Sequence, residues 1–307
     1  MTFSAPPVKR LTTSAPRPYN ESSVFPRGDT MIVDFHTHTF PDRIAAGAIA
    51  SMQQASHSAA FTDGTVGGLQ ASMRRAGVDA SVVLPVATNP LKLRSINDVS
   101  VSLTGKDGLI YFGCAHPDAP DLPDELERIA DAGLRGVKIH PVYQHTDIDD
   151  PRYIRLLTRC GELELTVVMH AGHDIGFPGE VRCSPEMIIR ALDASGPVQL
   201  VCAHMGGWRS WDEAAMLADH GVMIDTAFSL GSIVPADDHY APDELPLLTD
   251  EAFVRLVRTF GADRVLFGTD SPWAEQAEEL HRIRNLPLTE EEKAAILGGN
   301  AEKILNS

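Results

Sequence analysis

The sequence has few cysteines, no long apolar run and a deficit of basic residues. Its four cysteines lie far apart and form no C-x-x-C pair, which excludes a disulfide-stabilised scaffold. No apolar run approaches the roughly 18 residues that a membrane-spanning helix needs. Lys and Arg number 26 against 42 Asp and Glu, and the resulting net charge of −16 argues against a nucleic-acid-binding surface. A chain of 307 residues, 43% of them hydrophobic, suits one large or two small globular domains.

Two of the cysteines and the first thirty residues bear on where the protein works. Cys114 and Cys202 lie inside apolar, strand-like runs, where a reduced thiol acts as a small core residue, so we expect a cytoplasmic protein. Residues 1–30 are rich in Pro and Ser and lack the apolar stretch of a secretory signal. We therefore expect a disordered leader over 1–30 and one globular domain over 31–307, with Met31 as an alternative native start.

From Ile32 onward, short β-branched runs alternate with amphipathic segments. The expected strands are Ile32–His36, Ser81–Val86, Leu109–Ala115, Gly136–His140, Leu165–His170, Val198–His204, Val222–Asp225 and Arg264–Asp270. The expected helices include Leu122–Ala132, Tyr153–Leu163, Pro185–Ala194, Trp211–His220 and Glu251–Phe260. Residues typical of helix starts support these positions. Asp150 and Ser184 each place a capping side chain before a proline at the first helical position, and Thr289 with Glu292 forms a capping box.

Eight strands with crossover helices, over roughly 250 residues, predict an α/β fold, specifically a closed (β/α)₈ TIM barrel forming a single domain. The alternative is a doubly wound open sheet. It is disfavoured because no G-x-G-x-x-G or G-x-x-x-x-G-K-[ST] loop follows the first strand.

Polar residues recur at the ends of the expected strands, and in a barrel the carboxyl ends of the strands carry the active site. These residues are His36, His38, Lys138, His140, His170, His204 and Asp270. His36 and His38 stand at i and i+2, so both imidazoles should point to the same face of their strand. His170 and Asp270 can complete a set of three nitrogens and one oxygen, which suits Zn²⁺, Mn²⁺ or Fe²⁺. A merely structural polar core would bury several ionisable groups without a compensating ion, which is costly.

Five stretches in this order resemble the amidohydrolase superfamily, within it the group similar to carboxymuconate-semialdehyde decarboxylases and pyrone-dicarboxylate lactonases. They are VDFHTHTFP (33–41), GVKIHP (136–141), VVMHAGHD (167–174), LVCAHMGG (200–207) and VLFGTDSPW (265–273). The resemblance implies a metal-dependent hydrolytic or decarboxylating enzyme. It also implies that His36, His38, His170 and Asp270 are metal ligands and that His204 is the catalytic or second-metal histidine.

Lys138 departs from the mononuclear members, because it is similar to the lysine that dihydroorotases carboxylate to bridge two metals. In that interpretation a Lys138 carbamate joins the metal ligands. In the other, Lys138 is an unmodified cation that binds a substrate carboxylate or pairs with an acid such as Asp270. We expect a divalent ion, in the first place Zn²⁺, and one ion rather than two.

Further residues are candidates for contact with the substrate. His140 and His173 are expected to support the metal ligands or to contact substrate. Arg182 and Arg209 could bind a carboxylate, and Trp208 and Trp273 could form walls of the pocket, although each could equally be an ordinary loop residue. His116 is interpreted as a hydrogen-bonded loop histidine.

Two reaction types and one non-catalytic alternative follow. In a hydrolase of an amide, lactone or related carbonyl compound, Asp270 takes the proton of a metal-activated water and His204 hydrogen-bonds the carbonyl or the water. This is the favoured interpretation. In a non-oxidative decarboxylase of a small carboxylic acid, His204 or Asp270 protonates the carbon instead. A catalytically silent, ligand-binding barrel is disfavoured because all four metal ligands are present.

The expected partners are a small-molecule substrate and a second copy of the chain, with which it would form a homodimer. We expect no nucleic-acid partner and no membrane.

Overall fold

The computed structural model describes residues 31–307, so the expected leader over 1–30 lies outside the described residues. Nine short strands lie along the described chain and form two parallel sheets, one of the first three strands and one of the other six, each in sequence order. They are β1 (Val33–Thr37), β2 (Ala80–Val83), β3 (Leu109–Tyr111), β4 (Gly113–Cys114), β5 (Gly136–Ile139), β6 (Thr166–Met169), β7 (Leu200–Cys202), β8 (Met223–Asp225) and β9 (Val265–Leu266).

These strands close into a barrel. β3 and β4 are separated by Phe112 alone, so together they form the third of the eight expected strands. The last strand returns to the first: the Phe35 N–H donates to the Phe267 carbonyl at 2.7 Å and the Asp270 N–H donates to the His36 carbonyl at 2.8 Å. The (β/α)₈ fold class predicted from the sequence is therefore confirmed.

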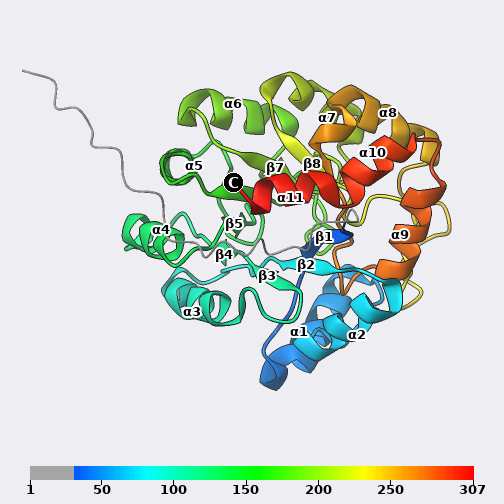
Figure 1. Cartoon of the computed structure of the whole chain (residues 1–307), viewed down its shortest axis with the longest axis horizontal. Helices are drawn as coiled ribbons and strands as arrows, with labels where there is room; N and C mark the ends of the chain where they lie inside the picture. The colour runs from blue at the N-terminus through cyan, green and yellow to red at the C-terminus, as the bar shows by residue number, and fades with distance from the viewer. Residues whose placement is uncertain (1–30) are drawn as a thin grey trace, which may run out of the picture.

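Helices surround the barrel in Figure 1, except that the last of them crosses the barrel end that faces the viewer. They are α1 (Asp42–Ser56), α2 (Val66–Ala76), α3 (Leu93–Leu103), α4 (Leu122–Asp131), α5 (Pro151–Glu162), α6 (Pro185–Ser195), α7 (Trp211–Ala214), α8 (Asp250–Phe260), α9 (Gln276–Asn285), α10 (Glu290–Ala294) and α11 (Asn300–Leu305). The described residues also form three 3₁₀ segments, η1 (Pro90–Lys92), η2 (Ala215–His220) and η3 (Ala262–Arg264), and one π-helical segment, η4 (Ala295–Gly299).

The expected helix starts are present. The Asp150 side chain accepts from the Arg152 N–H, the Ser184 hydroxyl accepts from the Met187 N–H, and Thr289 forms its capping box. One expected helix differs: Trp211–His220 is one α-helical turn followed by the 3₁₀ segment η2, not a continuous α-helix.

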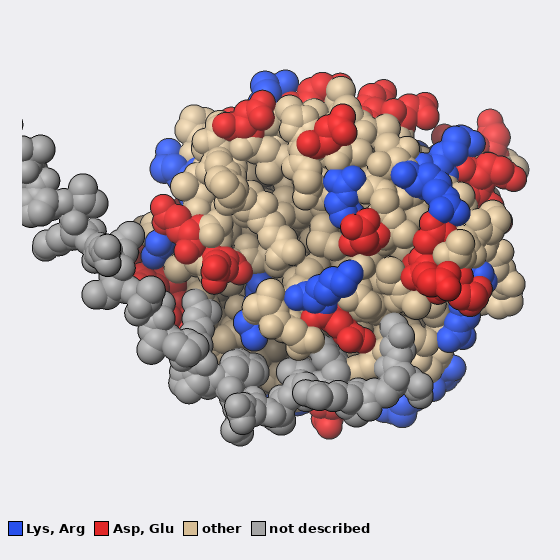
Figure 2. Space-filling model, turned by 45° about the horizontal axis from the view of Figure 1, so that its top comes forward, with Lys and Arg blue, Asp and Glu red and all other residues tan. Residues whose placement is uncertain are grey.

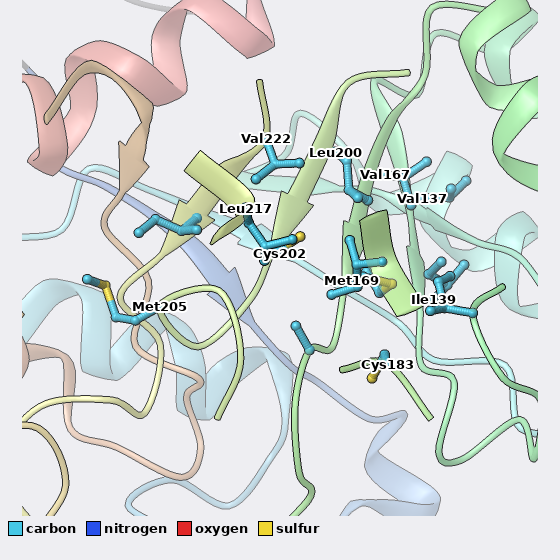
Figure 3. Packing of buried hydrophobic residues seen from close by; sticks show 14 of the residues in the cluster. Val137, Ile139, Val167, Met169, Cys183, Leu200, Cys202, Met205, Leu217 and Val222 are labelled. Carbon is cyan, nitrogen blue, oxygen red and sulfur yellow. The ribbon is translucent and has the colours of Figure 1, made fainter. Parts of the chain in front are cut away.

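Two apolar clusters form the core, one inside the barrel and one between the strands and the surrounding helices. One cluster fills the barrel with Val33, Phe35, Phe112, Val168 and Leu266, and residues of α11 pack against it. Because the Met31 N–H, just before β1, donates to Glu302 in α11, this helix closes the amino-terminal end of the barrel. The other cluster lies between strands and helices and is drawn in Figure 3, with members such as those labelled on β5, β6 and β7: Val137, Ile139, Val167, Met169, Leu200 and Cys202.

The outer surface is charged but mixed. On the face shown in Figure 2, acidic and basic side chains lie interspersed over the helices. Several form ion pairs, for example Arg152 with Asp118 at 2.7 Å and Arg190 with Asp149 at 2.7 Å. Within residues 31–307, no helix has the length and hydrophobicity to span a membrane.

Candidate metal centre

The open end of the barrel, opposite α11, gathers the polar residues that the sequence places at strand ends. His36 lies in β1 and Lys138 in β5, while His170 follows β6 directly. His204 and Asp270 lie in the segments that follow β7 and β9. The structure brings all five into one buried cluster, linked by the contacts described below.

A β-bulge in β1 sets the direction of the first two histidines. Asp34 lies opposite Ser81 and Thr37 opposite Val83, so two residues of β1 stand against one of β2. A bulge changes the alternation of side chains along a strand. Phe35 can therefore enter the barrel core beside Phe112 while His36 also reaches the cluster.

His36 and His38 direct their Nε2 lone pairs at each other. His36 Nδ1 lies 2.7 Å from Asp225 Oδ2, and His38 Nδ1 lies 2.7 Å from the Leu84 carbonyl oxygen. Both partners are acceptors, so each Nδ1 carries the proton of the neutral ring and each Nε2 is left with a lone pair. The two Nε2 atoms are 3.2 Å apart, and Asp270 Oδ1 is 3.4 Å from the first and 3.0 Å from the second. Three electron-pair donors thus converge on one point, the arrangement that a divalent cation requires.

His170 and His204 form a second facing pair by the same logic. His204 Nδ1 contacts the Ala227 carbonyl oxygen at 2.9 Å, and His170 Nε2 contacts the His173 carbonyl oxygen at 2.9 Å. The lone pairs of His204 Nε2 and His170 Nδ1 then face each other across 3.1 Å. The His36 and His204 ring centroids lie 5.2 Å apart, so this pair adjoins the first.

A further set of possible ligand atoms comes from His140, His170 and Asp174. Its hydrogen bonds argue against a cation there. His140 Nδ1 accepts from the Tyr143 N–H, so its Nε2 carries the proton and faces Asp174 Oδ2 at 3.4 Å. His140 is therefore held by Asp174 and stacks on the His170 ring, with centroids 4.2 Å apart.

Lys138 brings a buried amine to the cluster. Its side chain is 1% exposed and its Nζ lies 3.2 Å from His36 Nε2. Burial lowers the pKa of Lys138 to about 8, although the nearby carboxylates of Asp225 and Asp270 oppose the shift. Lys138 thus has a larger neutral fraction near neutral pH than an exposed lysine does.

The protonation states of the other members suit metal binding. Burial, and for His36 the Lys138 charge, lower the pKa values of His36 and His170 well below the usual range, so both rings are neutral at neutral pH. Burial by itself would raise the pKa of Asp270, but the adjacent rings of His38, His36 and His204 favour its ionised form and lower the pKa overall. Neutral imidazoles and an ionised carboxylate are the forms that ligate metals.

The backbone is unusual at the catalytic candidates. His204 has a φ of 61° and Asp270 a φ of 66°, a left-handed conformation that costs energy for residues other than glycine. Gly268 approaches His36 closely: a Cβ placed on it would stand 2.8 Å from the His36 Cβ. Only glycine therefore leaves room for His36 in its observed position.

The expected substrate contacts divide into two groups. Arg182 already pairs with Asp147 at 3.0 Å and with Glu180 at 3.1 Å. Arg209 donates to the main-chain carbonyls of Glu244 and Pro246. Both arginines thus have structural partners, and the structure offers no argument for a substrate carboxylate at either.

The aromatic and histidine candidates lie in the loops around the barrel mouth. Trp208 stacks on Phe228 with centroids 6.5 Å apart, and Trp273 packs against the same small apolar cluster. His173 acts through its backbone, which accepts from His170 and donates to the Trp208 carbonyl. His116 accepts from the Asp118 N–H, in line with its interpretation as a loop histidine.

Two buried carboxylates were missed by the sequence analysis. Asp225 is the last residue of β8, and Asp174 ends the quoted stretch VVMHAGHD. The position of Asp225 at the end of an expected strand could have marked it as a candidate site residue. Its contacts with His36 and His204, far away in the sequence, could not be read from that position.

Comparisons with known proteins agree with this geometry. A family model described as amidohydrolase matches residues 33–306. No curated protein matches the sequence.

Solved structures share the fold at low sequence identity. A 5-carboxyvanillate decarboxylase from Sphingomonas paucimobilis is 16% identical, with 91% of this chain and 99% of that one covered and a TM-score of 0.65. A 2,6-dihydroxybenzoate decarboxylase from Rhizobium is 15% identical over 91% and 99%, with a TM-score of 0.65. A Pseudomonas putida protein named as a candidate 2-pyrone-4,6-dicarboxylic acid hydrolase is 18% identical over 91% and 98%, with a TM-score of 0.60.

Proposed function

The chain belongs to the amidohydrolase family, and from that premise we propose that it is a divalent-metal-dependent, non-oxidative decarboxylase of a small carboxylic acid. The observation that carries the proposal is the convergence of the His36 and His38 lone pairs and the Asp270 carboxylate beside His204 and Lys138. This arrangement offers a cation site, a proton carrier and a buried positive charge within one cluster.

The ion would be held by His36, His38 and Asp270, with His170 adjacent through its contact with His204. With His170 as a fourth ligand, the set has three nitrogens and one oxygen, which suits Zn²⁺, Mn²⁺ or Fe²⁺. A single ion agrees with an unmodified Lys138. A bound divalent ion would polarise a substrate oxygen and so stabilise negative charge that develops next to it.

The side chains supply the remaining chemistry. Lys138 attracts the substrate carboxylate as a point charge. When the bond between that carboxyl group and its carbon breaks, carbon dioxide leaves and the electron pair stays on the carbon. His204, once protonated at Nε2, delivers a proton to that carbon as a general acid.

This proposal reverses the preference that the sequence suggested. The sequence by itself favours a hydrolase, whereas among the similar structures a 5-carboxyvanillate decarboxylase and two 2,6-dihydroxybenzoate decarboxylases support the decarboxylase. Hydrolysis is the second candidate. It is supported by the ionised Asp270, which could accept a proton from water, and by the Pseudomonas putida structure.

Isotope incorporation separates the two reactions. The metal-loaded protein is incubated with a panel of hydroxybenzoates and of cyclic lactones, in deuterium oxide and separately in oxygen-18 water. A decarboxylase releases carbon dioxide and leaves one deuterium on the product carbon, with no oxygen-18 in the product. Incorporation of one oxygen-18 without carbon dioxide release would establish the hydrolase and refute the proposal.

A further inference from the structure

Asp225 is a fully buried carboxylate that contacts both halves of the metal centre. Its Oδ2 lies 2.7 Å from His36 Nδ1. Its Oδ1 accepts the backbone N–H of His204 at 2.8 Å and that of Ala227 at 3.2 Å. One side chain at the end of β8 therefore joins a candidate metal ligand of β1 to the candidate proton carrier that follows β7.

The two oxygens of Asp225 are not interchangeable. Oδ1 receives two backbone N–H groups, so an acceptor is required on that side. Oδ2 faces His36 Nδ1, and a carboxylate oxygen there forces the imidazole proton onto Nδ1. The His36 lone pair is thereby left on Nε2, the atom that faces His38 and Asp270.

We propose that Asp225 is a positioning residue that fixes the His36 tautomer for metal binding and holds the backbone of His204 beside it. A carboxylate that orients a ligating imidazole also raises the basicity of that ligand. The inference rests on the metal centre of the proposed function, but not on which reaction takes place there.

The variant Asp225→Asn tests this directly. Its amide oxygen must remain on the side of the two N–H groups, because an NH₂ group there would oppose two donors. The NH₂ group then points at His36 Nδ1 and requires a lone pair on that atom. His36 is driven to the Nε2–H tautomer and loses its metal-facing lone pair, while the contact with His204 is kept.

We expect Asp225→Asn to weaken Co²⁺ and Zn²⁺ binding by about 10- to 100-fold, measured by competition with a chelator. Glu125→Gln is the matched control: Glu125 is also buried, but its carboxylate contacts Asn97 and Arg128, which lie outside the metal centre. This control should leave metal affinity unchanged. An affinity within about threefold of wild type in Asp225→Asn would overturn the proposal.

A second measurement does not depend on the variant or on activity. Nitrogen-15 NMR of the histidine side chains in the metal-free wild-type protein reports which ring nitrogen carries the proton. His36 should be protonated at Nδ1, and an Nε2–H tautomer would overturn the proposal even if Asp225→Asn fails to fold. Failure of the decarboxylase assay would leave both results intact, so the two proposals fail separately.

Discussion

Asp270 is the carboxylate on which both reaction types depend, because it contacts His36 and His38 and remains ionised. Asp270→Asn keeps the shape and one oxygen ligand but removes the negative charge. We expect a folded protein with weakened metal affinity and turnover at least roughly a hundredfold lower at the metal concentration that saturates wild type. Steady-state kinetics with metal titration would measure both effects.

The same variant distinguishes the reactions. In a decarboxylase, the loss in Asp270→Asn should follow metal occupancy and recover at high metal. A hydrolase needs Asp270 as a base and should stay slow when saturated. Wild-type turnover at the ordinary metal concentration would show that Asp270 neither binds the ion nor moves a proton.

At the level of residues, the sequence predicted which candidate metal ligands come together, but not which side chains hold them in place. His36, His38 and Asp270 stand out because polar groups end apolar strands. Asp225 could not be assigned its role, because its partner His36 is 189 positions away and the contact depends on β8 lying near β1 across the barrel mouth. The ion pairs of Arg182 with Asp147 and Glu180 could not be read from the sequence either.

Among the helices, α9 carries a buried acid whose ionisation should affect stability. Burial raises the pKa of Glu279 from 4.5 to about 8, although Arg282 lies 3.5 Å away and opposes the shift. The unfolded chain ionises near 4.5, so between that pH and about 8 the folded state binds the extra proton and loses stability as pH rises. The loss is at most about 4 kcal/mol between pH 5 and 8, since one pH unit is worth about 1.4 kcal/mol per proton.

Glu279→Gln keeps the shape of the side chain without ionising. We expect it to unfold at a higher denaturant concentration than wild type at about pH 8.5, with a smaller difference at about pH 5. Glu278→Gln is the control: this exposed neighbour pairs with Arg282 at 3.0 Å and should change stability little at either pH. An equal effect of Glu279→Gln at both pH values would contradict the shifted ionisation.

For the strands, the sequence predicted their positions but not the irregular pairing of β1 with β2. All eight were located from β-branched runs, but the bulge in β1 was not. Simple alternation puts Asp34 on the same face as His36, whereas the structure turns Asp34 to Thr269 and Gln276. The bulge depends on the register with β2, which a five-residue strand does not encode by itself.

For the whole molecule, we predict that residues 1–30 are dispensable. Their sequence lacks hydrophobic periodicity, so deleting them should change neither the melting temperature nor the metal affinity. Deleting residues 1–37 is the contrasting variant. It removes β1 and with it the hydrogen bonds that close the barrel against β9, so cooperative unfolding should be lost. A fall of more than a few degrees on removing 1–30 alone would show that this segment packs on the barrel.

The closure of the barrel between β1 and β9 also has a consequence for how the protein is made. His38 and Asp270 meet at 3.0 Å although 232 positions separate them, so the candidate ligand set needs residues that follow both the first and the last strand. During synthesis His36 and His38 leave the ribosome early. Asp270, the carboxylate that they contact, follows only when almost the entire chain has been translated. High-affinity cation capture should therefore be among the last events of maturation, and a truncated nascent chain should compete poorly for the cellular metal supply.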